Sequence, residues 1–384
     1  MNRNVTLAGH ALTLDRFPLS KDPNLQAWDA ADEYLIKQIE ELGLLDSEQT
    51  IHIYNDGFGA LTCALAARAT SSNLAFKLVN ISDSFLAQQA CKTNLQQNSP
   101  TDADVTFLSS MDAIERDADL VLMKVPKNHG LLTHQLAQIS QYRSMPTVLA
   151  SAKANLLPRS VVEQFNRLGS SQPSLAWKKC RVIHCQPEQA NRLSLPEPLR
   201  WKLENSSFTM VNHANVFARQ QLDIGARFLL EQLPKNEAFK QVIDLGCGNG
   251  VLTLCLLANN DVEEMIAIDE SYMAVSSADS SVMENLPEKH KHCQFVTNNC
   301  LDGFKANTAD LIVCNPPFHQ NNAVMDDIAW QMFKDAKRVL TPGGKLRIVG
   351  NRHLGYHIKL KRLFGHCKTV AGNKKFVILE ASKN

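Results

Sequence analysis

The sequence predicts an α/β protein built from two tandem Rossmann-like, doubly wound domains that arose by duplication. Two observations support this prediction. Short apolar runs rich in branched residues alternate along the chain with longer stretches of helical periodicity, which is the pattern of a parallel sheet with helices on both faces. Two segments of the first half also recur in the second half at one constant offset, and such a match indicates an internal repeat.

Length and composition limit the classes of protein to consider. A chain of 384 residues can form two domains that each bury a core. The formal net charge of +1 supplies no overall field for a polyanion, so any nucleic-acid surface must be a local patch. The most apolar run, 251–258, is too short to cross a bilayer, and no membrane contact is expected. The ten cysteines show no Cys-x-x-Cys pair and no zinc spacing, which predicts free thiols, a cytoplasmic location and no metal.

The first half reads as repeated strand–helix units. A helix is expected over 25–42, and a strand at 50–54 meets a glycine-containing turn and passes into a helix at 60–68. The remaining elements alternate in the same way: strands at 76–81, 105–108, 120–125, 146–150 and 181–185, and helices at 83–97 and 129–142. Prolines and polar residues then mark 191–200 as a linker. We therefore expect one domain at 1–190 and a second at 201–384.

The second half begins with a short strand pair within 201–210 and a helix at 222–230. The strand at 242–245 enters a turn with three alternate glycines, and a helix follows. Glycines let a backbone approach a ligand closely, and the start of a helix presents N–H groups. The acid at the buried end of this strand has no evident role in a core. We therefore predict four cofactor-binding residues here: Asp244, Gly246, Gly248 and Gly250.

Polar residues also end the next two predicted strands. The strand at 265–268 ends in Asp269, where a nucleoside-binding sheet places its acceptor for the ribose hydroxyls. The alternative is that Asp269 is the N-cap of a helix at 271–285. The strand at 294–297 ends in Asn298 and Asn299, either of which suits an adenine edge.

The strand at 310–314 ends abruptly in Asn315-Pro316-Pro317-Phe318. Proline has no N–H to give to a sheet, so two prolines stop the strand and leave the carbonyls of Asn315 and Pro316 without ladder partners. Acceptors beside the aromatic ring of Phe318 suit a planar ring that carries an exocyclic amine. We predict Asn315, Pro316 and Phe318 as catalytic residues. A proline-rich turn with a capping asparagine is the alternative for this stretch alone.

The end of the chain is basic. A helix at 326–339, a turn at 341–344 and a strand at 345–350 lead into a tail from Arg352 onward. This tail holds eight basic residues against one acid, Glu380, and therefore carries a net charge of +7.

The two copies of the repeat are related by an offset of 191 residues. Residues 59–65 match 250–256, and residues 119–127 match 310–318. Where the second copy has its candidate site residues Asp244, Gly246, Asn315 and Phe318, the first has Ile53, Asn55, Lys124 and Lys127.

We expect the first copy to have lost the strand-end acid, to bind no nucleotide cofactor and to contact substrate instead. Lysines that could meet phosphates are Lys124, Lys127, Lys178 and Lys179, together with Lys374 and Lys375 in the tail. Ordinary solvated lysines are the alternative.

The segments 244–250 and 315–318, together with Asp269, resemble class I S-adenosylmethionine-dependent methyltransferases that act on an exocyclic amine. The duplication with a degenerate first half is similar to the RsmC/RlmG family of bacterial ribosomal RNA guanine-N2 methyltransferases. The segments 25–35, 212–217, 222–228 and 315–320 look closest to the large-subunit branch of that family. The resemblance covers essentially the whole chain.

This resemblance implies two class I methyltransferase folds and N2-methylation of a guanine in 23S rRNA, guanine-1835. It also implies S-adenosylmethionine as the cofactor without a metal, and 23S rRNA or a large-subunit precursor as the partner, with no obligate protein partner. Asn315 and the Pro316 carbonyl would accept from the guanine amine, and Phe318 would stack on the extruded base.

Other readings stay open at this point. The motif around Asn315 also serves methylation of a 16S rRNA guanine, of adenine N6 in DNA, or of a protein glutamine. A reading from another class is a non-catalytic RNA-binding or ribosome assembly protein that kept the fold.

Overall fold

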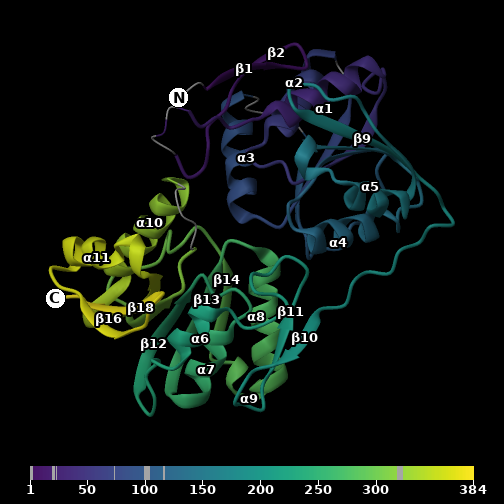
Figure 1. Ribbon diagram of the computed structural model, residues 1–384. Coiled ribbons are helices and arrows are strands. Elements are labelled where there is room, and N and C mark those ends of the chain that lie inside the picture. Colours follow the sequence, from purple (N-terminus) through teal and green to yellow (C-terminus); the bar gives the residue numbers. More distant parts are fainter. Residues whose placement is uncertain are drawn as a thin grey trace. The chain divides into compact units, whose positions relative to one another are not determined.

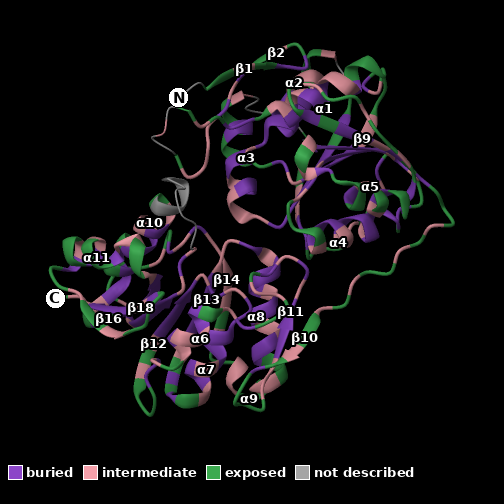
Figure 2. Cartoon of the chain, in the orientation of Figure 1, coloured by how far each residue is buried: buried purple, intermediate pink, exposed green. Residues whose placement is uncertain are grey.

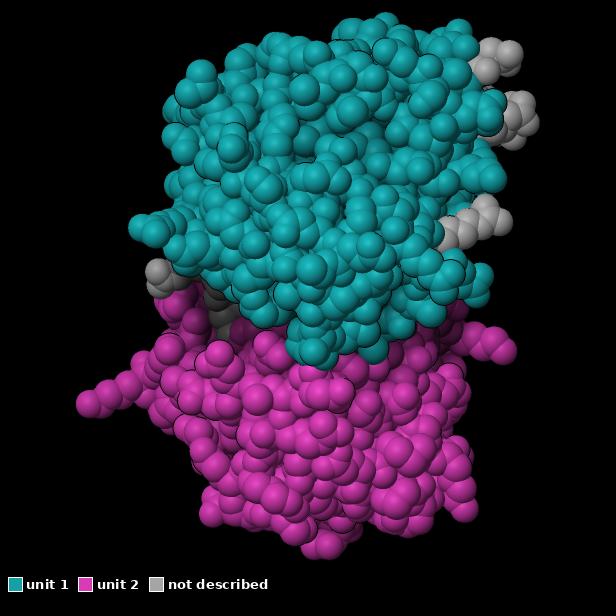
Figure 3. All heavy atoms as spheres, turned by 90° about the vertical axis from the view of Figure 1, so that its right-hand side faces the viewer, with its two compact units in different colours: residues 1–196 teal, residues 197–384 magenta. Residues whose placement is uncertain are grey.

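The computed structural model describes residues 3–19, 22, 24–72, 74–98, 104–115, 117–317 and 323–384, without the side chains of 323–326. The chain divides into two compact units, residues 1–196 (unit 1) and 197–384 (unit 2), coloured separately in Figure 3. The division falls within the segment 191–200 that the sequence marks as a linker. Leu193 still packs against the core of unit 1, and the first strand of unit 2 begins at Leu199.

Unit 1 contains nine strands and five α-helices among its described residues (Figure 1). In chain order they are β1 (Asn4–Leu7), β2 (His10–Thr13), α1 (Ala30–Glu41), β3 (Gln49–Tyr54), α2 (Ala60–Ser72), β4 (Phe76–Ser82), α3 (Phe85–Asn98), β5 (Val105–Ser109), β6 (Leu120–Lys124), α4 (His129–Ile139), β7 (Thr147–Lys153), α5 (Arg159–Asn166), β8 (Gly169–Pro173) and β9 (Cys180–Pro187).

Unit 2 follows the same plan. Its elements are β10 (Leu199–Lys202), β11 (Thr209–Asn212), α6 (Ile224–Leu230), β12 (Ala238–Leu245), α7 (Val251–Asn259), β13 (Asp261–Asp269), α8 (Tyr272–Asn285), α9 (Pro287–His290), β14 (Cys293–Thr297), β15 (Ala309–Cys314), α10 (Ala323–Val339), β16 (Leu340–Asn351), the 3-10 turn η2 (Arg352–Leu354), α11 (Tyr356–Phe364), β17 (Lys368–Gly372) and β18 (Phe376–Ser382).

Each unit is organised around one seven-stranded sheet, and the two sheets have the same topology. The strand order is β5-β4-β3-β6-β7-β9-β8 in unit 1 and β14-β13-β12-β15-β16-β18-β17 in unit 2. The first five strands in each order are parallel, and the sixth pairs antiparallel with both of its neighbours, so the seventh runs in the direction of the first five. The α/β class and the doubly wound order are therefore confirmed, and the shared topology matches the sequence repeat.

The antiparallel strands correct the expectation of purely parallel sheets. The predicted strand at 181–185 runs antiparallel to β7. The basic tail is folded into α11, β17 and β18, with β18 paired between β16 and β17. Strands β8 and β17 carry few apolar residues because they lie at sheet edges, so the sequence gives no strand pattern there.

Helices cover both faces of each sheet, which explains the continuous apolar character of the central strands. In β12, Val242 belongs to a core cluster with α6 and α7, whereas the next residue, Ile243, belongs to a cluster with α10 and α11. Figure 2 shows the central strands buried. Among the described residues, no helix has the length and apolar character needed to span a bilayer.

The glycine shared by the two repeats has a packing role. Gly59 and Gly250 have φ values of +82° and +79°. A Cβ at either position would lie 2.7 Å from a backbone Cα of the next helix, at Cys91 or Ala278. The sequence match at 59–65 and 250–256 therefore reflects the close approach of α2 to α3 and of α7 to α8, which both units need.

We predict that Gly59→Ala destabilises unit 1 by about 2–4 kcal/mol, because the substitution adds both a steric clash and an unfavourable left-handed conformation. Gly57→Ala is the matched control, since a Cβ there meets nothing within 4 Å. Urea unfolding of both full-length variants measures the effect. Equal unfolding midpoints for the two variants would contradict this account of the glycine.

Candidate active site

The predicted site residues of unit 2 converge where the strand order of the sheet reverses. Leu245 at the end of β12 pairs with Cys314 on β15 and with Ile268 on β13. The residues that follow these strands, Gly246 and Asn315, therefore leave the sheet side by side, next to Asp269 at the end of β13. In open α/β sheets, this carboxyl edge at the reversal point is where ligands bind.

Asp244 is completely buried below this edge. Its Oδ2 accepts hydrogen bonds from the Thr253 backbone N–H (3.0 Å) and the Thr253 hydroxyl (2.7 Å), which anchors the first turn of α7. The expectation that an acid here has no core role is therefore wrong. Its other oxygen, Oδ1, is buried and has no hydrogen-bond partner among the described residues. Burial raises the pKa of Asp244 to about 7, only partly opposed by the two bonds from Thr253.

The glycine turn and Asp269 are held together by hydrogen bonds. The N–H groups of Gly246 and Cys247 both donate to the Ile268 carbonyl at 2.8 Å. Gly248 donates from its N–H to Asp269 Oδ2 at 3.0 Å, with φ at +53° and no atom within 4 Å of an added Cβ. The carboxylate of Asp269 is thus oriented by the turn, and the turn leaves open space for a ligand.

The N-cap position of α8 belongs to Ser271 and not to Asp269. Ser271 is the N-cap of α8 and accepts a hydrogen bond from the Ala274 N–H, whereas Asp269 Oδ1 accepts from the Ser271 N–H at 3.1 Å.

The two asparagines after β14 differ in their surroundings. Asn298 is half-buried, and its Nδ2 donates to the carbonyls of Cys300 and Asp302. Asn299 is buried, and its Nδ2 donates to Asp302 Oδ2 at 2.6 Å. Asn298 is the more accessible of the two. The backbone N–H of Asn298 donates to the Asp269 carbonyl, so Asn298 lies beside Asp269, the predicted acceptor for the ribose hydroxyls.

Asn315 has a defined orientation and an unpaired acceptor. Its Nδ2 lies 3.5 Å from Asp223 Oδ2, and Asp223 is the N-cap of α6. This contact turns Asn315 Oδ1 away from Asp223, and that oxygen is buried without a hydrogen-bond partner among the described residues. Pro316 follows and is buried. Phe318 lies outside the described residues. The sequence prediction assigned Asp223 no role, although an Asp directly before a helix signals an N-cap.

The cysteines near the site are not nucleophiles. Burial raises the pKa of the Cys247 and Cys314 thiols well above the ordinary value, so both stay protonated at neutral pH. Within the described parts of the chain, no three His, Cys, Asp or Glu side chains are grouped as metal ligands would be.

The equivalent edge of unit 1 is filled by its own side chains. Asn55, at the position of Gly246, donates from Nδ2 to the Lys124 carbonyl and to Gln135 Oε1, each at 2.9 Å. Lys124, at the position of Asn315, pairs with Asp29 (2.8 Å) and Asp32 (2.6 Å) on α1. Burial opposes the charge of Lys124, but the two carboxylates outweigh it and raise the pKa of the ammonium group.

These contacts correct one expectation. Lys124 neutralises the buried Asp32 and the exposed Asp29, so we remove it from the candidate phosphate contacts. The strand-end acid is absent from unit 1, where Ile53 stands, but another residue takes over its hydrogen-bonding role. Asp56, three residues after Ile53, accepts from the Thr62 N–H and hydroxyl, both at 2.8 Å, as Asp244 does from Thr253.

The other candidate lysines are exposed and lie at the carboxyl edges of the sheets. Both units carry a Lys-Lys pair directly before the sixth strand in the order of the sheet. The pair is Lys178-Lys179 before β9 in unit 1 and Lys374-Lys375 before β18 in unit 2. The first residues of β9 and β18 pair with the last residues of β7 and β16. Lys178 is ion-paired with Glu33, whereas Lys127 follows β6 in an exposed loop.

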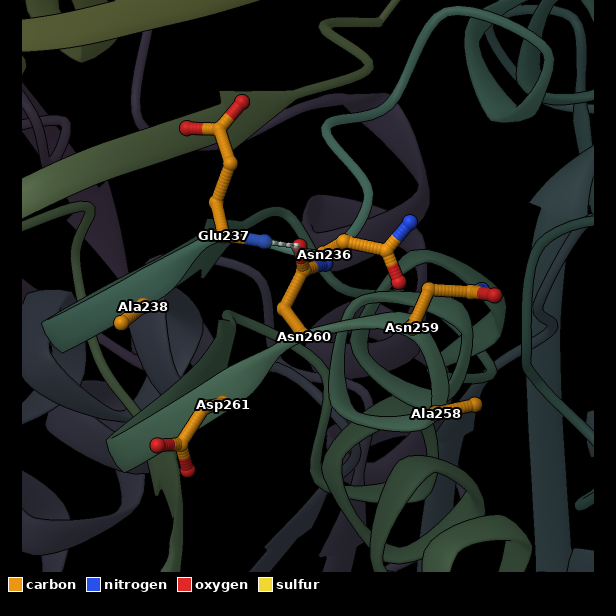
Figure 4. Close-up of a pocket in the computed structure, with 7 residues that line it drawn as sticks. All are labelled: Asn236, Glu237, Ala238, Ala258, Asn259, Asn260 and Asp261. Carbon is orange, nitrogen blue, oxygen red and sulfur yellow. Dashed lines mark hydrogen bonds between the residues drawn. The ribbon is translucent and has the colours of Figure 1, made fainter.

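A hollow of about 400 Å³ lies at the opposite, amino-terminal edge of β12 and β13 (Figure 4). It is lined by residues 236–238 and 258–261, and Asn260 Oδ1 there accepts from the Glu237 N–H. No candidate site residue belongs to it, so this hollow is separate from the site.

Comparisons with known proteins cover both units. The family model "RLMG N-terminal domain" matches residues 2–189, and the model "Methyltransferase small domain" matches residues 207–380. A Vibrio vulnificus protein named ribosomal RNA large subunit methyltransferase G is 46% identical over 387 residues, with 100% of both chains covered. A Klebsiella pneumoniae protein of the same name is 46% identical, with 98% of this chain and 97% of the relative covered.

A solved structure has a similar fold. It is the T. thermophilus 16S rRNA N2 G1207 methyltransferase (RsmC) in complex with AdoMet and guanosine. The likeness covers 99% of this chain and 97% of that one, with a TM-score of 0.73 at 19% sequence identity. At this identity the likeness establishes the fold.

We predict that ionisation of Asp244 destabilises the ligand-free protein. Since the pKa is about 7 when folded and 3.8 ordinarily, the folded state binds more protons between these values, and stability falls as pH rises from about 4 to 7. Asp244→Asn keeps acceptors for Thr253 and removes this loss. Hydrogen exchange of the β12 amides measures the free energy of unfolding of both proteins. The stability difference in favour of the variant should grow from pH 5 to 7 by at most about 1.4 kcal/mol per pH unit, and should stay constant at higher pH. A difference that does not change with pH would contradict the assignment.

Proposed function

Because the chain belongs to the family of ribosomal RNA large subunit methyltransferase G, we propose that it methylates the N2 amine of one guanine in 23S rRNA, with S-adenosylmethionine as the methyl donor. The resemblance of its motifs to this family points to guanine-1835 as the target. The observation that supports transfer to an exocyclic amine is the buried, unpaired Oδ1 of Asn315 at the carboxyl edge of the sheet, and the choice of guanine N2 comes from the family resemblance. An unpaired buried acceptor costs about 1–3 kcal/mol, a cost that an amine donor of the substrate would offset.

The residues of unit 2 fit S-adenosylmethionine. The turn at 246–250 leaves open space at Gly248, where the backbone can approach the methionine part of the cofactor. Asp269 is oriented to accept from the ribose hydroxyls, and Asn298 or Asn299 would meet the adenine edge. The unpaired Oδ1 of Asp244 adds a buried acceptor beneath the same turn. When bound, the cofactor supplies a methyl group on a positively charged sulfur.

Asn315 and Pro316 would act on the amine. The lone pair of guanine N2 is delocalised into the ring, so the amine is a weak nucleophile. Asn315 Oδ1 and the Pro316 carbonyl would accept its two N–H bonds, which favours a tetrahedral nitrogen with its lone pair aimed at the methyl group. These two acceptors would hold the amine while it takes up the methyl group, and the proton that the amine then loses would pass to solvent. This mechanism depends on positioning and electrostatics and needs no covalent intermediate.

Asp223 would be a positioning residue in this mechanism. Its Oδ2 is fixed by the Ala226 N–H at 2.8 Å and faces the Asn315 amide nitrogen. The amide is therefore held with its oxygen toward the substrate before the substrate arrives.

The carboxyl edge also provides a path for the RNA backbone. Lys374 and Lys375 form an exposed turn on this edge, and the Arg352 N–H and guanidinium both bond the same turn, at the carbonyls of Lys375 and Asn373. In unit 1, Lys127, Lys178 and Lys179 lie on the corresponding edge. We propose that these lysines contact phosphates, since such contacts position a nucleic acid without reading its sequence.

We predict that Asn315→Ala lowers methyl transfer to unmethylated 23S rRNA by about 100-fold or more, while leaving S-adenosylmethionine binding within a fewfold of the wild type. Isothermal titration measures cofactor binding, and incorporation of labelled methyl measures transfer. Asn259→Ala, an exposed asparagine at the opposite edge of the same sheet, is the matched control and should behave as the wild type. Intact binding with transfer reduced only a fewfold would exclude the role given to Asn315.

The charge of the β17–β18 turn has its own test. Reversing both charges with Lys374→Glu and Lys375→Glu should weaken rRNA binding at low salt by tenfold or more. The slope of log affinity against log salt should also fall by about 1–2, since each single-strand phosphate contact contributes about 0.7. The same two changes at Lys235 and Lys240, near the amino-terminal edge of β12, alter net charge equally and should have little effect. Equal losses for the two pairs would show a general charge effect without a phosphate path.

A further inference from the structure

A second asparagine at the carboxyl edge shares the unusual state of Asn315. Asn351 ends β16, and its Oδ1 is buried without a hydrogen-bond partner among the described residues. Asn351 also occupies the N-cap position of η2, where an asparagine oxygen normally accepts from a backbone N–H, yet it makes no such bond. A donor of a bound substrate could complete this acceptor.

Asn351 is aligned with Asn315 across neighbouring strands. β15 and β16 are parallel, and Cys314 pairs with Ile348. The next residues along the two strands, Asn315 and Val349, therefore lie opposite each other. Asn351 lies two residues further along, which places the two Cα atoms roughly 8 Å apart, from a strand spacing near 4.8 Å and a rise near 3.3 Å per residue. Side chains that are two residues apart share one face of a strand. Val313 and Val349 both pack in the cluster that contains α6, so Asn315 and Asn351 follow them on the α6 face.

The backbone of Asn351 is held firmly. Its position pairs with Phe376, the first residue of β18, and the N–H of the next residue, Arg352, donates to the Lys375 carbonyl at 3.0 Å. The backbone that carries the acceptor is therefore fixed between the Asn315 end of the edge and the Lys374-Lys375 turn. A nucleotide that offers its base amine to Asn315 and its phosphate to that turn would pass over Asn351.

The Watson–Crick edge of guanine offers two neighbouring donors, the N2 amine and N1–H. Adenine and 2,6-diaminopurine carry a lone pair at N1, which an acceptor oxygen repels. We propose that Asn351 Oδ1 accepts the hydrogen bond from N1–H of the target guanine, next to the N2 amine at Asn315, and thereby selects guanine. This proposal rests on the function proposed above and adds a specificity residue to it.

The test compares two target bases in each protein. The full-length wild type and the variants Asn351→Ala and Asn351→Asp are assayed on 23S rRNA assembled by ligation with guanine or 2,6-diaminopurine at the target position. Both bases carry the 2-amine that receives the methyl group, and only guanine has N1–H. The wild type should prefer guanine by about 10- to 100-fold in kcat/KM, as expected when a hydrogen-bonding site meets a base without the matching donor.

Asn351→Ala should lose most of this preference, because transfer to guanine falls and transfer to 2,6-diaminopurine does not. Asn351→Asp keeps an acceptor and should keep the preference. A purely structural role would lower both rates together, and an unchanged ratio in Asn351→Ala would overturn the proposal. If that variant does not fold, the wild type decides, since equal rates on the two bases are incompatible with an acceptor at N1. Failure of the wild type to methylate the guanine RNA would overturn the proposed function as well.

Discussion

The structure of the site depends on the abrupt end of β15. Pro316 and Pro317 cannot continue the sheet, so Asn315 emerges at the reversal point with its side chain on the α6 face. Asp223 then holds the amide nitrogen, and the amide oxygen is left buried and unpaired. Asp244 adds a second unpaired oxygen one strand away. Donors of a cofactor or substrate could complete these two acceptors, which lie at the same carboxyl edge as the glycine turn and Asp269.

Unit 1 shows what the same topology looks like when this edge is closed. The strand order is identical, and the glycine that lets α2 approach α3 is retained at Gly59. The edge itself is different, because Asn55 and Gln135 bond each other and Lys124 pairs with two carboxylates of α1. The fold therefore does not require the open turn or the unpaired asparagine oxygen. Their presence in unit 2 is explained by chemistry rather than by the needs of the sheet.

The sequence predicted the elements whose signals are local. The strand ends at Asp269 and Asn315 could be brought together in advance because parallel strands share a carboxyl edge. Residues that depend on distant partners could not be found. Lys124 meets carboxylates more than 90 positions earlier in the chain, so it read as a free cation. Asp56 replaces Asp244 from a shifted position that a constant offset hides. Asn351 lies before a short 3-10 turn, and only its missing cap bond distinguishes it.

The open edge of unit 2 is proposed to serve transfer of a methyl group to a guanine N2 in 23S rRNA. Mass mapping of modified nucleosides in rRNA from cells that lack this protein tests it most directly. The account predicts that one N2-methylguanine is missing from 23S rRNA, that 16S rRNA is unchanged, and that the wild-type chain restores the modification. A full set of N2-methylguanines in 23S rRNA from those cells would contradict it.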